Sequence, residues 1–297
     1  MKCDLCPRKC LVDRKKGEKG ICGQTENLKV ARAALHFWEE PCISGDAGSG
    51  AVFFSGCPLH CVFCQNENIA NGTVGKEISL ERLVDIFLEL QEKRANNINL
   101  VTPGHFVPQI VKALDQARRE GLTLPVVYNT SSYETVDTIK MLEGYVDIYL
   151  PDFKYMSPVL SKKYSHAPDY AEVAKAAIAE MVRQTGKAVF VNGEEDNLIL
   201  SGTIVRHLTL PGCMADSMQI LKYLHDTYGD KIYISIMNQF TPLSNLEKYP
   251  ELNRRITDEE YETLVDYAIE TGIENGFIQE GNTAEESFIP AFDCEGV

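Results

Sequence analysis

The chain has 297 residues, of which 44% are hydrophobic and 24% are charged, and its formal net charge is −14. This acidic balance excludes a general nucleic-acid binder, which needs a basic excess to meet phosphate. The composition is that of a folded globular protein, large enough for one big domain or two smaller ones. No stretch of sequence approaches the roughly 20 apolar residues of a membrane-spanning helix, and the first residues are too polar for a signal peptide. We therefore expect no membrane contact and a cytoplasmic location.

The ten cysteines need an explanation, because cytosolic thiols are kept reduced and disulfides are uncommon there. Metal or redox chemistry is the better interpretation. Seven of the ten fall into two groups, and Cys42, Cys213 and Cys294 stand apart. The first group is Cys3, Cys6, Cys10 and Cys22, and the second is Cys57, Cys61 and Cys64.

The order of the segments predicts a small head and one long domain. Residues 1–45 form a cysteine-rich head with a basic run from Arg8 to Lys19, and Gly45 opens the turn region that ends it. In residues 46–297, short β-branched or aromatic runs alternate with amphipathic stretches. The predicted strands are 51–54, 98–101, 125–128, 146–150, 204–208 and 232–236.

The stretches between these strands have the apolar spacing of helices. Alternating strands and helices indicate a parallel sheet of βαβ units. About six units with no Gly-x-Gly-x-x-Gly after the first strand favour a partial or complete α/β barrel over a nucleotide-binding open sheet. We expect the segment 276–292 to pack on the core, or alternatively to cover the barrel. Helices are predicted after a Ser79 cap, over 107–114, about 134–142, over 169–185 with Asp169 as cap, over 215–228, and from Thr257, where Glu260 completes a capping box.

The second cysteine group directly follows the first predicted strand, in Ser55-Gly-Cys57-Pro-Leu-His-Cys61-Val-Phe-Cys64. In a barrel this position is the catalytic mouth at the carboxyl ends of the strands. Three thiolates on one loop can hold three irons of a cubane cluster, whereas a structural zinc site needs four protein ligands. The fourth iron is then open to the amino and carboxylate groups of a small molecule.

The spacing Cys-x3-Cys-x2-Cys, with Phe63 before the last cysteine, resembles the signature of the radical S-adenosylmethionine (SAM) enzymes. Along nearly its whole length the chain is similar to the pyruvate formate-lyase activating enzyme-like branch, in the subgroup with an N-terminal cysteine-rich segment. The resemblance implies a partial (β/α)6 TIM-like barrel of the radical SAM type, with a C-terminal helical extension and a small N-terminal cysteine-rich metal-binding head. It also implies a [4Fe–4S] cluster that cleaves S-adenosylmethionine reductively to a 5′-deoxyadenosyl radical, which abstracts hydrogen from a substrate.

The resemblance further implies cofactor contacts at the ends of the later strands. The family loop Gly-Gly-Glu, which holds the methionine amino group, corresponds here to a stretch without the glutamate, so Thr102 and backbone carbonyls take that role. Asn238 or Gln239 stands where activating enzymes place a histidine. His207, next to Arg206, should face the opposite side of its strand. The expected cofactor-binding residues are Phe63, Thr102, Gly104, Asn129, Asp152, Lys154, Arg206 and Asn238.

The four N-terminal cysteines are enough to close a tetrahedral zinc site or to hold a second [4Fe–4S] cluster that relays electrons. Their spacing does not choose between these two, and free thiols are the third interpretation. Cys42 could replace one of the four.

The leading functional hypothesis is a radical SAM enzyme that generates a 5′-deoxyadenosyl radical at the mouth of the barrel. The resemblance to glycyl-radical activating enzymes suggests that this radical abstracts hydrogen from a glycine of a partner protein. Electrons should come from reduced flavodoxin or ferredoxin, for which the basic run offers a local contact. The alternatives are radical modification of another protein or of a small molecule, an iron–sulfur sensor without radical turnover, and a zinc-dependent structural module. We expect Trp38 to pack the head onto the barrel rather than bind a ligand.

Overall fold

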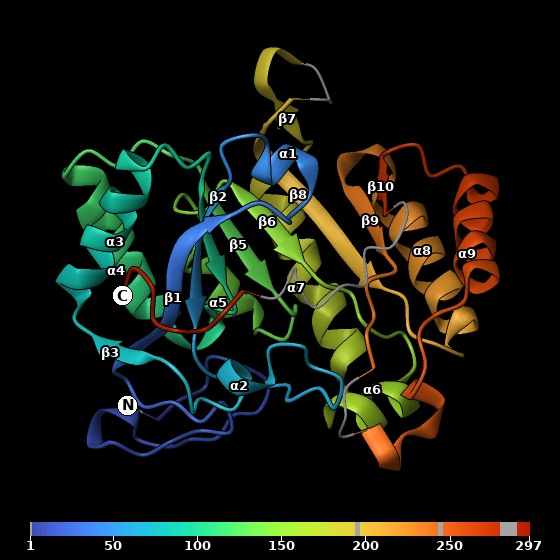
Figure 1. Ribbon diagram of the computed structural model, residues 1–297, viewed down its shortest axis with the longest axis horizontal. Coiled ribbons are helices and arrows are strands. Elements are labelled where there is room, and N and C mark those ends of the chain that lie inside the picture. Colours follow the sequence, from blue (N-terminus) through green and yellow to red (C-terminus); the bar gives the residue numbers. More distant parts are fainter. Residues whose placement is uncertain (1, 194–196, 243–245, 280–289) are drawn as a thin grey trace.

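The computed structural model describes residues 2–193, 197–242, 246–279 and 290–297 (Figure 1). In this part of the chain, neighbouring strands follow the order β10-β9-β8-β6-β5-β4-β2-β1-β3, and β7 pairs with β8. All pairs from β2 to β10 along this path are parallel, whereas β1 pairs antiparallel with both β2 and β3. The strands are β1 (Leu28–His36), β2 (Ser49–Phe54), β3 (Lys76–Ile78), β4 (Ile98–Val101), β5 (Val126–Thr130), β6 (Ile148–Pro151), β7 (Val189–Phe190), β8 (Ile199–Leu208), β9 (Tyr233–Met237) and β10 (Gly276–Ile278).

All six predicted strands are present, as β2, β4, β5, β6, β8 and β9, and they form a partial α/β barrel. The sheet path ends at β10 on one side and at β3 on the other, so the barrel is not closed. The strand β1 was not predicted, because its alanine-rich sequence lacks the β-branched and aromatic residues that indicate a strand. It lies inside residues 1–45, and the division of the chain at residue 45 stays a prediction.

The helices lie outside the sheet, at the ends of the strands or between them (Figure 1). Each predicted helix is present, and α1, α2 and α6 are additional. Short 3₁₀ turns occupy Arg14–Lys16, Gly104–Phe106, Val191–Gly193, Gly229–Lys231, Leu246–Lys248 and Pro250–Leu252. The helices are α1 (Pro41–Ser44), α2 (Glu67–Ala70), α3 (Leu80–Glu92), α4 (Val107–Arg119), α5 (Val136–Lys140), α6 (Pro158–Ser165), α7 (Tyr170–Thr185), α8 (Met214–Tyr228) and α9 (Asp258–Thr271).

Two of the three predicted helix caps are confirmed. The Ser79 side chain accepts a bond from the Arg82 amide, and Thr257 forms a full capping box with the third helical residue of α9. Asp169 stands at the start of α7, but its side chain caps no helix amide. Its carboxylate instead accepts the Tyr133 hydroxyl at 2.8 Å, so Asp169 occupies the predicted N-cap position without making the capping bond. A tertiary partner has replaced the local one.

The strands are buried on both faces. The sheet therefore lies between an outer core, which packs against the helices, and the core of the barrel interior. Val126 and Tyr128 belong to the core that packs against helices α3 and α4, whereas Val127, between them, belongs to the interior. The interior core also contains Cys42 and Ile43 of α1, which precede β2. The short helix α1 therefore closes the end of the barrel at which the strands begin, and the cysteine loop after β2 lies at the opposite end.

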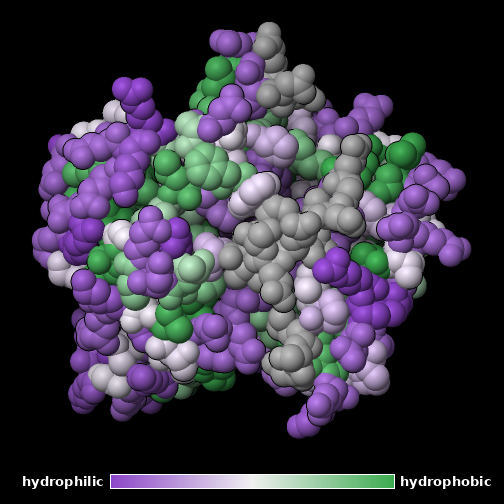
Figure 2. Space-filling view, viewed as in Figure 1, coloured by the Kyte–Doolittle hydropathy of each residue, from purple (hydrophilic) through white to green (hydrophobic). Residues whose placement is uncertain are grey.

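Among the described residues, no helix combines the length and the apolar character that a bilayer crossing requires. Hydrophilic side chains cover most of the face shown in Figure 2, with smaller apolar patches between them. The segment 276–292, which we expected to pack on the core, includes residues 280–289 outside the described part of the chain. Of the described remainder, the Phe292 ring packs edge-on against Phe53 with the ring centres 5.4 Å apart.

Candidate active site

A cavity of about 720 Å³ opens at the carboxyl ends of the parallel strands. Its wall combines the thiols of the loop after β2 with polar side chains from the ends of β5, β6 and β8. The opposite wall comes from the segment before α1 and from β10. The predicted site residues that line the cavity are Cys57, Cys61, Phe63, Cys64, Thr102, Asn129, Asp152, Lys154 and Arg206.

The cysteine loop is held against α6 by one buried aromatic side chain and a backbone hydrogen bond. Phe63 is 5% exposed, and the centre of its ring lies 6.0 to 6.5 Å from those of Tyr155, Tyr164 and Phe240. The Val62 amide donates to the Tyr164 carbonyl at 2.9 Å. These contacts fix the loop from behind, so its sulfur atoms are presented to the cavity.

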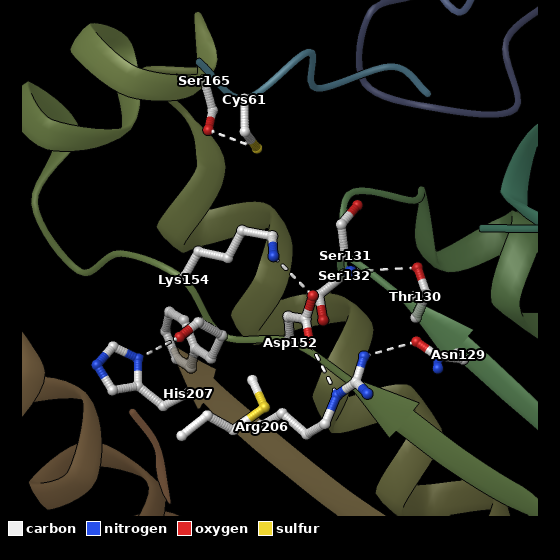
Figure 3. Close-up of polar contacts among 12 residues, drawn as sticks. Cys61, Asn129, Thr130, Ser131, Ser132, Asp152, Lys154, Ser165, Arg206 and His207 are labelled. Carbon is white, nitrogen blue, oxygen red and sulfur yellow. Dashed lines mark hydrogen bonds and ion pairs between the residues drawn. The ribbon is translucent and has the colours of Figure 1, made fainter. Parts of the chain in front are cut away.

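The three thiols share this small volume and influence one another. Burial, reinforced by the neighbouring Cys61 thiolate, raises the pKa of Cys57 to about 11. Burial also raises the pKa of Cys61 and Cys64, although the nearby Lys154 ammonium opposes the rise. The Ser165 hydroxyl donates to Cys61 Sγ at 3.0 Å (Figure 3). Without a metal these clustered thiols are protonated and neutral. A bound metal stabilises the thiolate form, because its positive charge offsets the charge of the sulfur atoms.

Arg206 of β8 is the centre of a polar network inside the cavity (Figure 3). Its Nε donates to Asp152 Oδ1 at 3.0 Å, and one terminal nitrogen donates to Asn129 Oδ1 at 2.6 Å. The other terminal nitrogen donates to Glu39 Oε2 at 2.9 Å. The second oxygen of Asp152 accepts a bond from Lys154 Nζ at 2.6 Å. The network joins three strand ends into one rigid constellation.

The charges in this network stabilise one another. Burial disfavours ionised Asp152, but Lys154 and Arg206 outweigh it and hold the pKa of this carboxyl below its usual value. In the same way Asp152 keeps the pKa of Lys154 above its usual value, although burial acts in the opposite direction. All three side chains are therefore charged at neutral pH. Such a site offers one carboxylate and two cations to a zwitterionic ligand.

The prediction that His207 faces away from Arg206 is confirmed. Its ring nitrogens are 2.8 Å from the Phe153 carbonyl oxygen and 2.8 Å from Ser217 Oγ, outside the cavity (Figure 3). Burial lowers the pKa of His207 to about 4. The ring is therefore neutral at physiological pH. Its direction, opposite to that of Arg206, follows from the alternation of side chains along a strand.

Two of the expected cofactor residues do not line the cavity. Gly104 lies in a 3₁₀ turn where a side chain would meet the Glu134 carboxylate, and Asn238 is followed by Gln239, which does line the wall. Thr102 lines it with φ of +56°, which is an unusual conformation for a β-branched residue. Of the two residues expected near the last strand, Gln239 rather than Asn238 reaches the site.

Sequence reasoning missed two glutamates of the segment before α1. Glu39 Oε1 accepts bonds from Asn129 Nδ2 at 3.0 Å and Asn99 Nδ2 at 3.2 Å, while its other oxygen binds Arg206. Glu40 is 8% exposed, and burial raises its pKa. Both enter the cavity from the end of the barrel where the strands begin. No local motif marks them, because only the packing of α1 brings them to the strands.

Trp38, in the same segment, was predicted to pack the head onto the barrel. It is 61% exposed and lines the cavity, so that prediction was wrong. Cys42 is buried in the barrel interior, among Ile43, Val127 and other apolar side chains. It therefore does not replace one of the four N-terminal cysteines.

The four N-terminal cysteines lie together, outside the lining of the cavity. Burial, together with the nearby thiolates of Cys22, Cys10 and Cys3, raises the pKa of Cys6 to about 12. Among the described residues, no three His, Cys, Asp or Glu side chains are grouped so that they could hold one metal ion. The thiols of a [4Fe–4S] cluster each bind a different iron and therefore lie farther apart than the ligands of one metal ion.

Residues 51–198 match the sequence profile of a family described as the Radical SAM superfamily. The chain carries a radical SAM domain. The uncharacterized protein MJ0674 of Methanocaldococcus jannaschii is 28% identical to this chain over 272 residues, which are 90% of this chain and 74% of that protein.

Two solved structures share the fold of this chain. One is SuiB of Streptococcus suis bound to S-adenosylmethionine, with 12% identity and a TM-score of 0.52 over 76% of this chain. The other is HydG, a maturase of the [FeFe]-hydrogenase, with 15% identity and a TM-score of 0.51 over 78% of this chain. The present chain spans 49% of the SuiB structure and 52% of the HydG structure.

Radical SAM enzymes use a [4Fe–4S] cluster and S-adenosylmethionine, and the cavity fits both groups. The three thiols of the loop face one space, and the described lining of the cavity contains no fourth cysteine. Three thiolates leave one iron of a cluster without a protein ligand. The charged network of Asp152, Lys154 and Arg206 shares the same space and suits the amino and carboxylate groups of a zwitterion.

Proposed function

We propose that this protein is a radical SAM enzyme that abstracts a hydrogen atom from a glycine of a partner protein. The observation that carries the proposal is the shared cavity, in which the three loop thiols face the charged network at the ends of β5, β6 and β8. When bound, the reduced [4Fe–4S] cluster supplies one electron that cleaves S-adenosylmethionine into methionine and a 5′-deoxyadenosyl radical.

The loop residues hold the cluster and limit its access to water. Cys57, Cys61 and Cys64 ligate three irons, and Ser165 donates a hydrogen bond to the Cys61 sulfur. Hydrogen bonds to ligand sulfurs and the burial of a cluster both tune its reduction potential. The Phe63 ring closes the rear of the loop against α6 and keeps solvent from that side.

The strand residues bind and orient S-adenosylmethionine. Lys154 and Arg206 attract its carboxylate, while Asp152 between them keeps both cations in place. Asn129 presents its amide to the ribose or carboxylate, and the Thr102 region accepts the ammonium in place of the missing glutamate. Because the network is hydrogen-bonded before any ligand arrives, little reorganisation is needed on binding.

A glycine of a partner protein is the proposed substrate because of the sequence resemblance to activating enzymes in Asp152-Phe-Lys154 and at Arg206. The exposed lysines of the head support a low-potential acidic electron carrier such as reduced flavodoxin or ferredoxin as donor. Radical modification of a small molecule is the competing substrate class. An iron–sulfur sensor without turnover is the competing function.

The decisive experiment measures 5′-deoxyadenosine after anaerobic reconstitution, reduction with dithionite and addition of S-adenosylmethionine. We expect product with the natural chain and with Cys213→Ala, whose thiol lies outside the cavity lining, and none with Cys61→Ala. A reduced cluster without 5′-deoxyadenosine in any sample would contradict the enzyme and favour the sensor. Incubation with deuterated candidate partners then separates protein from small-molecule substrates, because deuterium appears in 5′-deoxyadenosine only with the true substrate.

A further inference from the structure

The backbone of the N-terminal segment folds so that its four cysteines converge. The Cys3 amide donates to the Val12 carbonyl and the Leu11 amide donates to the Cys3 carbonyl, each at 3.0 Å. The Lys9 amide closes a turn on the Cys6 carbonyl at 3.0 Å. These bonds bring Cys3, Cys6 and Cys10 together, although they are spread along a segment with little regular structure.

Cys22 joins this group from the far end of the segment. A Cβ on Gly20 would lie 3.4 Å from Cys10 Sγ and 3.7 Å from Cys22 Sγ, so glycine leaves room between these two sulfurs. The Ile21 amide points at Cys10 Sγ, with 3.3 Å between nitrogen and sulfur. Amide hydrogens directed at cysteine sulfurs stabilise thiolates that bind metal.

The segment is docked on the cysteine loop of the cavity by side chains that bind carbonyl groups. Arg8 Nε donates to the Pro58 carbonyl at 2.9 Å, and its terminal nitrogens donate to the carbonyls of Ser165 and His166. The ring of His60 lies 2.7 Å from the Ile21 carbonyl. Two basic residues of the head thus act internally, because the buried Arg14 likewise binds the carbonyls of Thr25 and His105.

A short path leads from one cysteine group to the other. A Cβ on Gly56 would lie 2.5 Å from the Cys22 carbonyl oxygen, so the two backbones are in direct contact. Gly56 has φ of +93° and immediately precedes Cys57. An electron moving from the Cys22 sulfur to the Cys57 sulfur crosses one non-bonded contact, and all other steps follow covalent bonds.

The outer side of the head carries positive charge in a protein that is otherwise acidic. Lys9, Lys15, Lys16 and Lys19 are exposed around the cysteine group, while the net charge of the chain is −14. A local basic patch of this kind steers an acidic carrier to this site rather than elsewhere on the surface. The carrier then meets the N-terminal cysteines before the cavity.

We propose that Cys3, Cys6, Cys10 and Cys22 hold a second [4Fe–4S] cluster that delivers electrons to the cluster of the cavity loop. Four thiolates satisfy all four irons, so this centre has no open position and transfers electrons only. A reduced one-electron carrier of the flavodoxin or ferredoxin class reduces it from the 2+ to the 1+ state. It returns to 2+ when the loop cluster accepts that electron. The presence of the cluster is independent of the proposed function, whereas its relay role rests on it.

The first test removes the cavity cluster and counts what is left. A chain with Cys57→Ala, Cys61→Ala and Cys64→Ala is reconstituted anaerobically with iron and sulfide, and its iron, sulfide and zinc are measured. We expect about four iron and about four sulfide per chain, with a paramagnetic signal after reduction by dithionite. About one zinc per chain without sulfide, or no bound metal, would overturn the proposal.

A second variant covers the case in which this triple substitution does not fold. Cys22→Ser in the natural chain should lower bound iron from about eight to about four per chain. Cys213→Ala is the matched control, because its thiol belongs to neither group, and its iron content should stay unchanged. An unchanged iron content in Cys22→Ser would contradict a cluster at the N-terminal cysteines.

The relay is tested by changing the reductant. In Cys22→Ser, 5′-deoxyadenosine formation driven by reduced flavodoxin should fall by at least about tenfold, because the carrier docks at the head. Formation driven by dithionite, a small ion that reaches the cavity directly, should change less. Equal losses with both reductants would refute the relay but leave the cluster count intact. Absence of product from the natural chain with both reductants would instead refute the proposed function.

Discussion

The loop of the cavity and the N-terminal head both gather cysteines, but they hold them in opposite ways. The loop has three thiols, packs through the buried Phe63 ring and faces an open space of about 720 Å³. The head has four thiols, is held by arginine bonds to carbonyl groups and does not line that space. The comparison teaches that the free volume beside the thiols, together with their number, decides whether a centre can bind substrate.

Substitution of a loop thiol is the strongest way to break this comparison. In Cys57→Ala we expect 5′-deoxyadenosine formation to fall by more than about 100-fold, because loss of even an outer partner of a metal ligand costs about 10- to 100-fold. The measurement is product yield after reduction by dithionite. Substantial product from this variant would show that the loop does not hold the catalytic cluster.

The charged network that shares the cavity with the loop has no counterpart in the head, and Asp152→Asn tests its role. The change leaves Lys154 and Arg206 without their shared carboxylate, so the free energy of unfolding should fall by about 3–5 kcal/mol. Binding of S-adenosylmethionine, measured by calorimetry, should weaken with it. Asp115→Asn is the control, since its pair with Arg119 is exposed and contributes less than about 1 kcal/mol. Similar losses in both variants would contradict a buried functional network.

The barrel behind the loop should also respond to pH. Burial raises the pKa of Glu134 to about 7 from 4.5, so the folded state binds its proton more tightly than the unfolded state. The stabilisation is complete below pH 4.5 and is lost as the pH rises through 7, which corresponds to about 3 kcal/mol. Denaturant unfolding of Glu134→Gln should lack this loss. The lowered pKa values of His105 and His207 affect the natural chain and Glu134→Gln equally, so their effect cancels when the two pH profiles are subtracted. Parallel pH profiles would refute the assignment to Glu134.

The contact between the two cysteine regions is tested by a pair of glycines. Gly56 and Gly121 both have positive φ, +93° and +106°, so alanine is strained at either position. Only at Gly56 would the added Cβ meet another backbone, that of Cys22. We expect Gly56→Ala to lose about 1–2 kcal/mol more of the free energy of unfolding than Gly121→Ala. Equal losses would show that the head does not press on the loop.

Local patterns determined much of this fold before any tertiary contact was considered. Short β-branched or aromatic runs of four residues indicated β2, β4 and β5, because buried parallel strands have mostly apolar side chains on both faces. The capping residues Ser79 and Thr257 located two helix starts, because a cap is a contact over three residues. Asp169 failed as a cap because a distant hydroxyl, that of Tyr133, competed for its carboxylate.

Some residues of the candidate site could also be predicted from the sequence, whereas others could not. Asp152, Lys154 and Arg206, predicted at the ends of β6 and β8, line one cavity, since parallel strands end at one edge of the barrel. Their role in cofactor binding stays a prediction. Glu39 and Glu40 were not predictable, because they reach that cavity from a segment at the opposite end of the strands. Gly104 and Asn238 were expected in the wall and lie outside its lining. A strand pattern specifies the face of a residue but not how far a following loop turns away.

The sequence by itself determined the cysteine spacing, the order of strands and helices and the face on which Arg206 lies, because each depends on residues close together in the chain. Only the tertiary structure decided which groups meet: Glu39 with Arg206, Arg8 with the Pro58 carbonyl, and the Cys22 backbone with Gly56. These pairs are separated by 34 to 167 residues in the sequence. Their contacts depend on how whole elements pack, and no periodicity or motif within one segment encodes that packing.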